Sequence, residues 1–439
     1  MHRIVINGQI GQEHAASFWA ASTRETFNPP PLIGDLETDI AIIGGGFTGL
    51  SAAHHARFSG YSVAVLDANQ IGWGGSGRNG GNVVPRYKQT FPELEKQYGL
   101  NVAIHMYRIA QDALDTLETI VNHHALKCDF WRTGLLTPLL KEIDITRFEK
   151  DVEWVKRHIG DTASRILNRR ETAYMVGSDF YQAAYIEPRA AAIHPLEYCQ
   201  GLGKALEKCN VRLFSGTPAL SWRKKGDCLF IITPKGTVRA RQLIIATNAY
   251  SHISVSGSRI KKTYIPVTSA VISTTSLQSD IRRSILPEGQ VVTDAKRLTN
   301  YYRLMRDGSL IFGGRGSASD NEAEKVYENL RRSMVRIFPQ LRDVSIQNKW
   351  CGSVAVTLDN LPFIGKLQES VHFAVGYSGR GVALSALLGR ELARRAGGDI
   401  EDLGPISGRR FPRIPCYELR APVRRIAMSY MSLMDKLGF

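Results

Sequence analysis

The segment 39–67 constrains the fold of this chain more than any other stretch. An apolar run at 40–43 leads directly into Gly-Gly-Gly-Phe-Thr-Gly at 44–49, a small-residue segment continues to Gly60, and a second apolar run ends on Asp67. This order predicts a strand, a glycine turn, a helix and a second parallel strand, which together form the unit that binds dinucleotides.

Each glycine of this turn has a separate role in such a unit. Gly44 would allow the tight turn, Gly46 would let the backbone approach a pyrophosphate, and Gly49 would let the helix pack against the strand. The pyrophosphate would bind the free amides at the start of the helix, and Asp67 would accept a hydrogen bond from a ribose hydroxyl. The unit alone does not distinguish FAD from NAD, and a doubly wound fold with an empty turn is the alternative.

Length and composition place the chain among ordinary globular proteins. With 439 residues it should form about two or three domain-sized units, and its 43% hydrophobic and 22% charged residues exclude a disordered chain. No apolar run approaches the ~20 residues that span a bilayer. The first residues are too short and mixed for a signal peptide, so we expect a cytoplasmic protein.

The net charge of +15 indicates an anionic partner. Because the basic residues are spread and no nucleic-acid recognition motif occurs, an anionic small substrate is favoured over nucleic acid. The six cysteines form no Cys-x-x-Cys pair, which argues against a zinc site or a redox pair. We interpret the histidines at 54–55 as helix-surface or packing residues, and the pair at 123–124 lacks a matching carboxylate, so we expect no metal site.

A glycine-rich loop follows the first unit. Residues 71–82 contain six glycines in twelve residues, which suits backbone lying against a flat ligand, although a solvent loop is the alternative. Beyond it the βαβ alternation stops. Helical patterns occupy 91–124, 147–159, 195–209 and 322–338, and strand patterns occupy 131–140, 211–214, 229–233, 238–240, 242–248, 267–274, 290–293, 301–304 and 310–313.

A second strand, glycine loop and helix occupies 371–395. Two such units far apart imply a discontinuous nucleotide domain, which we assign to 36–86, 185–250 and 345–400. Residues 87–184 and 251–344 would form a substrate-binding domain with an antiparallel sheet and helices, in an α/β (α+β) fold. Residues 1–35 would be an N-terminal arm and 401–439 a basic tail. Apolar residues at helical spacing in 420–436 predict a helix that docks on the protein body or, alternatively, lies on a membrane surface.

These motifs resemble a known family. The 38–49 and 72–81 segments, the Ala-Thr-Asn at 246–248, and the pattern from Trp350 through Thr357-Leu-Asp359 to Gly376-Tyr-Ser-Gly-Arg-Gly381 resemble the FAD-dependent D-amino-acid-oxidase superfamily. Within it, the chain is most similar to the γ-glutamylputrescine oxidoreductase group and related amine and imino acid oxidases. The resemblance implies a Rossmann-like FAD domain of the glutathione-reductase type.

The resemblance also implies which residues bind FAD. Asp67 stands where relatives usually carry Glu, and the loop around residues 379–382 would face the pyrimidine end of the flavin, where a helix N-terminus or a cation stabilises developing negative charge. The implied cofactor-binding residues are Gly44, Gly46, Phe47, Thr48, Gly49, Asp67, Ala68, Ser76, Arg78, Asn79, Gly80, Gly81, Ala219, Thr247, Asn248, Gly352, Gly379, Arg380, Gly381 and Val382.

Departures from the family pattern shape the expected chemistry. Gly352 occupies the position of the cysteine that tethers the flavin in sarcosine oxidases, so we expect non-covalent FAD. Ala383 replaces their carboxylate-binding lysine, and 352–364 lacks the arginine of D-amino-acid and glycine oxidases. Candidate replacements are Arg380, Arg303 and Arg315. Arg380 could equally be a structural cap, and the stretch 301–303 could be an aromatic stripe that packs a sheet.

The resemblance therefore implies an oxidase, with Arg380, Tyr302 and Arg303 as its candidate catalytic residues. Hydride would pass from the carbon beside a neutral amine nitrogen to flavin N5, the imine would hydrolyse, and oxygen would reoxidise the flavin to give hydrogen peroxide. The substrate would be a carboxylate-bearing amine such as γ-glutamylputrescine, iminodiacetate or pipecolate. The alternatives are a dehydrogenase that passes electrons to a quinone or carrier, and a flavin-carrying nucleic-acid-modifying protein.

Overall fold

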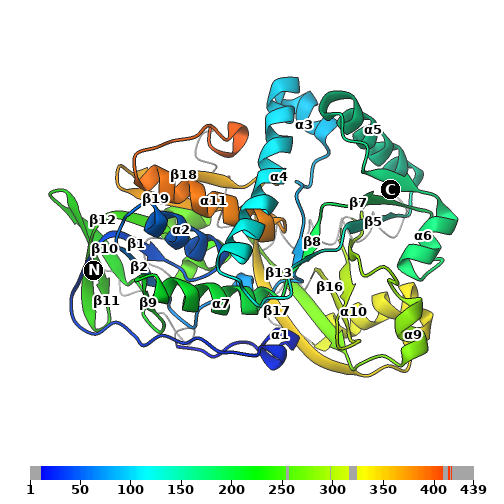
Figure 1. Cartoon of the computed structure of the whole chain (residues 1–439), viewed down its shortest axis with the longest axis horizontal. Coiled ribbons are helices and arrows are strands. Elements are labelled where there is room, and N and C mark those ends of the chain that lie inside the picture. The colour runs from blue at the N-terminus through cyan, green and yellow to red at the C-terminus, as the bar shows by residue number, and fades with distance from the viewer. Residues whose placement is uncertain are drawn as a thin grey trace.

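The computed structural model describes residues 11–253, 257–296, 298–315, 324–408, 414–415 and 417. Within them, two eight-stranded sheets stand side by side and a three-stranded sheet lies near their junction (Figure 1). The small sheet joins β3 (Asn82–Val83), β8 (Ala191–Ala192) and β4 (Trp131–Arg132). The predicted α/β fold with a Rossmann-like part and an antiparallel part is confirmed.

The first sheet is built around the glycine-turn unit. Strand β1 (Leu36–Ile43) runs parallel to β2 (Val63–Leu66) on one side and to β12 (Gly236–Ile245) on the other, and helix α2 (Phe47–Phe58) connects β1 to β2. The remaining strands are β9 (Arg212–Phe214) beside β2, β10 (Ser221–Lys225) and β11 (Cys228–Thr233) beyond the first half of β12, and β19 (Val371–Val375) with β18 (Phe363–Gln368) beyond its second half.

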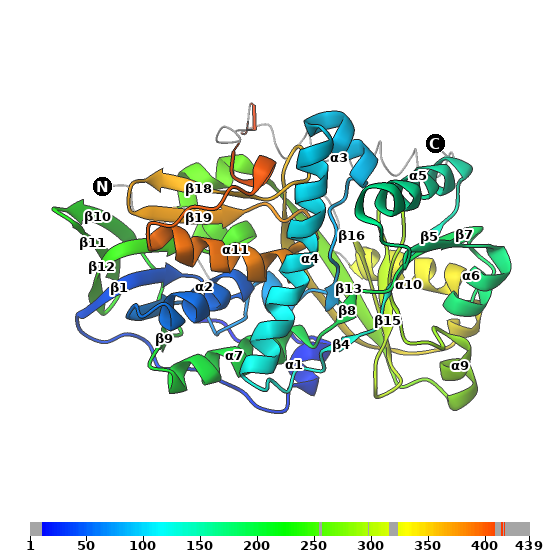
Figure 2. The ribbon, with the colours of Figure 1, turned by 45° about the horizontal axis from the view of Figure 1, so that its top comes forward.

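The helices of this part pack as one layer with a shared apolar core. Helix α11 (Gly381–Ala396) lies along α2, and α4 (Leu100–His123) crosses beside α11 (Figure 2). Helices α3 (Phe91–Tyr98) and α7 (Pro195–Lys208) complete the layer. The apolar face of α4, which lies in the segment 87–184 predicted for the substrate-binding domain, packs on the dinucleotide helices.

The second sheet is almost entirely antiparallel. Its order is β17 (Ile346–Val356), β13 (Ile265–Thr274), β16 (Leu310–Arg315), β15 (Tyr301–Leu304), β14 (Val291–Thr293), β5 (Leu135–Leu139), β7 (Ala183–Glu187) and β6 (Arg165–Leu167). The helices of this part are α5 (Glu142–Ile159), α6 (Arg169–Val176), α9 (Ser279–Ser284) and α10 (Glu324–Ile337). Since β17 pairs along β13, the boundary predicted at residue 345 moves to the end of β17.

The N-terminal segment runs along the first part of the molecule before β1. Its helix α1 (Phe18–Ser22) buries Trp19 completely, so this segment packs against the rest of the protein. None of the helices in the described ranges is long and apolar enough to cross a bilayer. The helix predicted at 420–436 lies outside the described residues.

Candidate functional site

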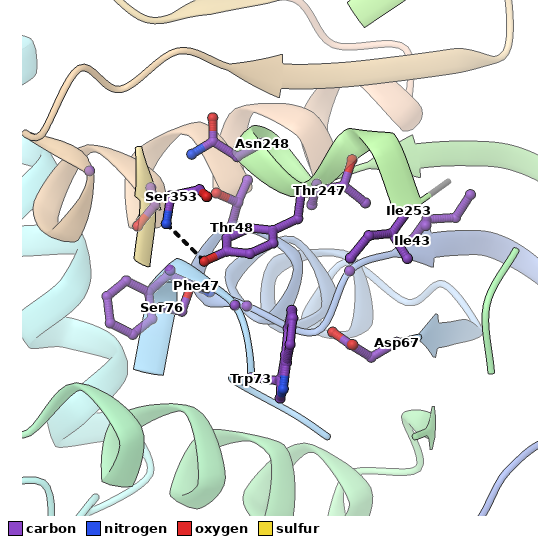
Figure 3. A pocket seen from close by; sticks show the side chains of 18 of the residues that line it. Ile43, Phe47, Thr48, Asp67, Trp73, Ser76, Thr247, Asn248, Ile253 and Ser353 are labelled. Atoms are coloured by element: carbon purple, nitrogen blue, oxygen red, sulfur yellow. Dashed lines mark hydrogen bonds between the residues drawn. The ribbon is translucent and has the colours of Figure 1, made fainter. Parts of the chain in front are cut away.

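A cavity opens where the parallel strands of the first sheet end. Its walls come from Ile43 at the end of β1, Asp67 after β2, Thr247 after β12, and the first residues of α2 and α11 (Figure 3). It encloses about 1180 Å³, part of it open to solvent. This is the edge at which ligands bind in open parallel sheets.

The glycine turn has the geometry that an extended phosphate ligand requires. Gly44 has a φ of +106°, and a Cβ at Gly49 would lie 1.9 Å from the Gly44 carbonyl, so larger residues would separate α2 from its strand. At the start of α2 the Phe47 amide donates to Ser76 Oγ at 2.9 Å, and the N-cap residue Gly46 has no side chain that could cap the amides that follow. The next amides of the first turn face the cavity region with the positive end of the helix.

Asp67 holds the turn as well as bordering the cavity. One carboxylate oxygen accepts from the Gly45 amide at 2.7 Å, and the other accepts from the Asn69 amide at 2.9 Å. Burial raises the pKa of this carboxyl, while the two amide hydrogen bonds oppose that rise. The side chain is only half-buried because it lines the cavity, which leaves lone pairs for a ligand hydroxyl.

The second glycine loop reaches the same cavity from the other side. Gly376, Ser378 and Gly379 have φ values of +84°, +52° and +87°, so the chain turns sharply before α11. Asn248 accepts from the Gly376 amide at 3.0 Å, which ties the end of β12 to this loop. No side chain caps α11, and Gly381 and Val382 in its first turn line the cavity.

The N-termini of α2 and α11 therefore both point at one cavity, and close packing between the two helices fixes their positions. A Cβ at Gly389 of α11 would lie 2.7 Å from the Thr48 carbonyl of α2, and Ser51 donates to the Ala386 carbonyl at 2.5 Å. Thr48 Oγ1 and Tyr377 Oη lie 2.7 Å apart within the cavity wall. A ligand with negative charge at both contact points fits this arrangement.

Aromatic residues that the sequence did not single out close the rim. Tyr250 packs its ring on Gly74 and accepts from the Ser353 amide at 3.0 Å. Trp73 meets Tyr250 edge-on at a ring distance of 5.6 Å. Other lining residues not predicted are Ile43, Leu66, Asn69, Gly74, Gly75, Pro218, Ala246, Ile253, Ser353, Val354, Tyr377 and Ser385. Of these residues, Trp73, Gly74, Gly75, Ala246 and Tyr377 lie inside motifs that the sequence had singled out, whereas Pro218 and Ile253 carried no sequence signal.

Most predicted cofactor residues meet at this cavity. Gly49, Arg78, Gly80, Gly81, Gly352 and Arg380 are not among the lining residues. The predicted residues that line it are Gly44, Gly46, Phe47, Thr48, Asp67, Ala68, Ser76, Asn79, Ala219, Thr247, Asn248, Gly379, Gly381 and Val382.

Neither side chain of the predicted pair on β15 lines the cavity. The fully buried Tyr302 stacks on Phe312 at 5.4 Å and donates to Tyr181 Oη at 3.2 Å, so it belongs to the core of the second part. Arg303 is also buried and donates to the carbonyls of Gly81 and Ile193 at 3.2 and 2.9 Å. These positions do not support substrate contact by either side chain.

Tyr301, on the opposite face of the strand from Tyr302, lies against the glycine-rich loop. A Cβ at Gly80 would lie 2.7 Å from its ring, and its hydroxyl lies 3.0 Å from Ser269 Oγ. Burial raises the pKa of this phenol to about 12, so it stays neutral. The side chain of Arg315, the third candidate cation, lies outside what the structure describes.

Arg380 stands beside the cavity, and no ion pair to it is found in the described part of the chain. It is the N-cap residue of α11, between the lining residues Gly379 and Gly381. Its Nε is buried without a hydrogen-bond partner, and no carboxylate of the described chain pairs with its guanidinium. Burial, together with the positive charge of Arg86, lowers the pKa of Arg380 to about 10.

Arg86 shows what a fully compensated buried arginine looks like here. Its guanidinium pairs with Asp151, lies 3.8 Å from Glu187 and donates to Tyr185 Oη at 2.5 Å. Both acids are almost completely buried with it. Burial lowers the pKa of Arg86, but the nearby acids and Tyr185 outweigh burial and hold that pKa above its ordinary value. Arg380 has no such partners among the described residues, and its pKa is lowered.

A family model described as FAD dependent oxidoreductase matches residues 39–395. The chain belongs to this family of FAD-dependent oxidoreductases. The resemblance stated from the sequence motifs is confirmed, and the dinucleotide is FAD. The cavity between two uncapped helix N-termini, with glycines where a Cβ would collide, fits that cofactor.

The full-length relatives belong to the same family. "Probable oxidoreductase OrdL" of Haemophilus influenzae is 32% identical over 432 residues, covering 97% of this chain and 98% of that protein. "Gamma-glutamylputrescine oxidoreductase" of Escherichia coli is 31% identical, covering 97% and 99%. Glycine oxidase from Geobacillus kaustophilus superposes with a TM-score of 0.71 at 18% identity, covering 85% of this chain and 99% of that one, which shows the shared fold.

Proposed function

We propose that this FAD-dependent oxidoreductase is an amine oxidase that oxidises a C–N bond in a carboxylate-bearing amine or imino acid. The observation that carries the proposal is the unpaired guanidinium of Arg380 at the start of α11. A guanidinium whose Nε is buried without a partner is costly unless a ligand supplies an acceptor and the negative charge. A carboxylate also satisfies a guanidinium through two parallel hydrogen bonds.

The similarity to a γ-glutamylputrescine oxidoreductase supports this substrate class. The compound in that relative's name carries both a carboxylate and oxidisable amine nitrogens. At 31% identity over nearly the whole chain, the substrate can differ while the chemistry is retained. Glycine-like, cyclic and N-substituted amino acids therefore belong to the same proposal.

The residues of this chain would bind, orient and shield the substrate. When bound, the flavin supplies the two-electron oxidation of the C–N bond. Arg380 would fix the carboxylate, and the ring of Tyr301 against Gly80 would form an apolar wall. The amine has to be neutral for its lone pair to assist, and a guanidinium nearby favours loss of the ammonium proton. The resulting imine would hydrolyse in water.

We also propose that the FAD is held without a covalent bond. The tether position of related enzymes is Gly352, and a Cβ there would lie 3.2 Å from the Arg78 Cβ. Precipitation of the holoenzyme with acid should therefore release all the flavin into the supernatant. Yellow colour retained in the washed pellet would refute this.

Anaerobic bleaching of the flavin tests the substrate class. The panel is γ-glutamylputrescine, putrescine, sarcosine, iminodiacetate, pipecolate and D-amino acids. We expect bleaching by one or more anionic members and none by putrescine, which lacks a carboxylate. Bleaching by putrescine alone would contradict the proposal, and a panel that leaves the flavin oxidised would do so as well.

Arg380→Gln tests the anion contact itself. We expect KM to rise or flavin reduction to slow by at least roughly tenfold, which is about 1.4 kcal/mol. The exposed Arg223, far along the sheet on β10, provides the matched control Arg223→Gln. Equal kinetics for the Arg380 variant and the control would remove Arg380 from the substrate site.

Oxygen is the proposed electron acceptor. With the best substrate, each oxidised molecule should give one hydrogen peroxide in air. Fast turnover with an artificial dye and little peroxide would identify a dehydrogenase instead. Binding of RNA that weakens with salt would favour the nucleic-acid alternative.

A further inference from the structure

Near its end, the glycine-rich loop is held by three side chains that hydrogen-bond to the carbonyls of residues 78, 79 and 81. Trp350 donates its indole N–H to the carbonyl of Arg78 at 2.9 Å, and Trp19 donates to the carbonyl of Asn79 at 2.8 Å. Arg303 donates to the carbonyl of Gly81 at 3.2 Å.

Capping a carbonyl fixes the direction of the next amide. In a trans peptide the C=O and N–H groups point in opposite directions, and no described peptide bond is cis. With the carbonyls of residues 78 and 79 directed at the tryptophans, the amides of Asn79 and Gly80 point away from them. No acceptor within the described part of the chain receives these two amides, and Asn79 lines the FAD cavity.

The capping residues come from three separate parts of the fold and support one another. Trp19 belongs to the N-terminal arm, Arg303 to β15 and Trp350 to β17. All three are buried, and the Arg303 guanidinium lies 5.7 Å from the Trp19 ring centre. The tryptophans share an apolar cluster with Phe18 and Met305. The caps therefore form a rigid outer wall behind the loop.

We propose that Trp19 and Trp350 are positioning residues that direct the Asn79 and Gly80 amides toward the bound FAD. The N-terminal arm is then part of the cofactor site, although it precedes the matched residues 39–395. Arg303 acts in the same wall, since this buried arginine donates to the carbonyl of Gly81 in the loop and to the neighbouring carbonyl of Ile193. This inference rests on FAD binding and is independent of the substrate.

The test compares Trp19→Phe and Trp350→Phe with Phe18→Leu. The tryptophan variants remove an indole N–H while keeping an aromatic ring, whereas Phe18→Leu perturbs the same cluster and leaves both hydrogen bonds intact. FAD titration of each apoprotein, the visible spectrum of the bound flavin and its midpoint potential are measured. None of these readouts needs a substrate.

We expect each tryptophan variant to raise the Kd for FAD about three- to tenfold and to shift the flavin spectrum and potential. Phe18→Leu should lower the unfolding midpoint and leave the spectrum and potential unchanged. Wild-type spectrum, potential and Kd in both tryptophan variants would overturn the proposal. Equal changes in Phe18→Leu would also overturn it, because they would show a general packing role. If Trp19→Phe does not fold, Trp350→Phe decides the question by the same criteria.

Discussion

The contact between α2 and α11 offers a sharp test, because one missing methyl group sets their separation. A Cβ on Gly389 would lie 2.5 Å from Ser51 Cβ and 2.7 Å from the backbone carbonyl of Thr48. A carbonyl of a helix cannot rotate away as a side chain can. Gly389→Ala should therefore force the two helices apart and move their N-termini at the FAD cavity.

The size of the effect follows from two opposing contributions. Alanine inside a helix is favoured over glycine by about 0.5–1 kcal/mol. Overpacking a tight core contact costs about 1–3 kcal/mol, so the net loss of unfolding free energy should be roughly 0–2.5 kcal/mol. Because both helix ends face the cofactor, we also expect the Kd for FAD to rise about tenfold, which corresponds to about 1.4 kcal/mol.

Gly201→Ala on α7 is the matched control. A Cβ there would meet only the Leu126 side chain at 3.5 Å, an ordinary contact, so the helix preference should act alone and stabilise the protein. Urea unfolding of the apoproteins and FAD titration measure both quantities. If Gly389→Ala matches or exceeds the wild type in stability and FAD affinity, the close approach of α2 and α11 does not set the geometry of the site.

Two further predictions concern single hydrogen bonds. Asp67→Asn replaces one acceptor oxygen by an NH₂ group, so either the Gly45 or the Asn69 amide loses its partner. We expect the Kd for FAD to rise roughly tenfold or more in a titration of the apoprotein. Unchanged affinity would refute a role for this carboxylate. His194 accepts from the Glu197 amide at 3.1 Å, and burial lowers its pKa from 6.5 to about 4. Between these two pH values the unfolded chain binds more protons than the folded protein, so the free energy of unfolding falls as the pH is lowered. Asn can cap the helix without titrating. His194→Asn should therefore reduce the fall in unfolding free energy between pH 7.5 and 5 by about 2 kcal/mol. Urea midpoints at both pH values measure this, and identical pH dependence in the variant would contradict it.

The two glycine loops could be predicted from the sequence because their chemistry is local. The first loop follows a strand and begins at Gly44, leads into a helix of small residues, and is followed by an acid at Asp67 after the second strand. Few folds other than a dinucleotide-binding unit require all of these features together. The second loop before α11 repeats this logic with Gly376 and Gly379, both at positive φ. Local backbone requirements of this kind are visible in residue order.

The partner of α4 could not be predicted in the same way. Its apolar spacing predicted a helix with one buried face, and Leu114 and Leu117 are indeed buried. Periodicity states which face is covered but not what covers it. The face packs on α11, which lies more than 250 positions later in the chain, as the residue numbers show.

Strand alternation explains the outcome on β15. Residues 301 and 302 necessarily face opposite sides of the sheet, so at most one of the two tyrosines can approach the flavin loop. The sequence contains no signal for which side that is. Tyr301 lies against Gly80 and Tyr302 lies in the core, and this choice was set by the register of β15 with β16.

The supply of acceptors separates three arginines that look alike in the sequence, of which Arg86 and Arg303 are buried and Arg380 is half-buried. Arg86, Arg303 and Arg380 each need acceptors, because an unpaired guanidinium is costly away from water. Arg86 meets carboxylates and Arg303 meets carbonyls, both from segments distant along the chain. Arg380 meets neither among the described residues, and its Nε remains unsatisfied beside the FAD cavity. Since the deficit of acceptors exists only after the chain is folded, the structure is needed to distinguish a ligand-binding arginine from a structural one.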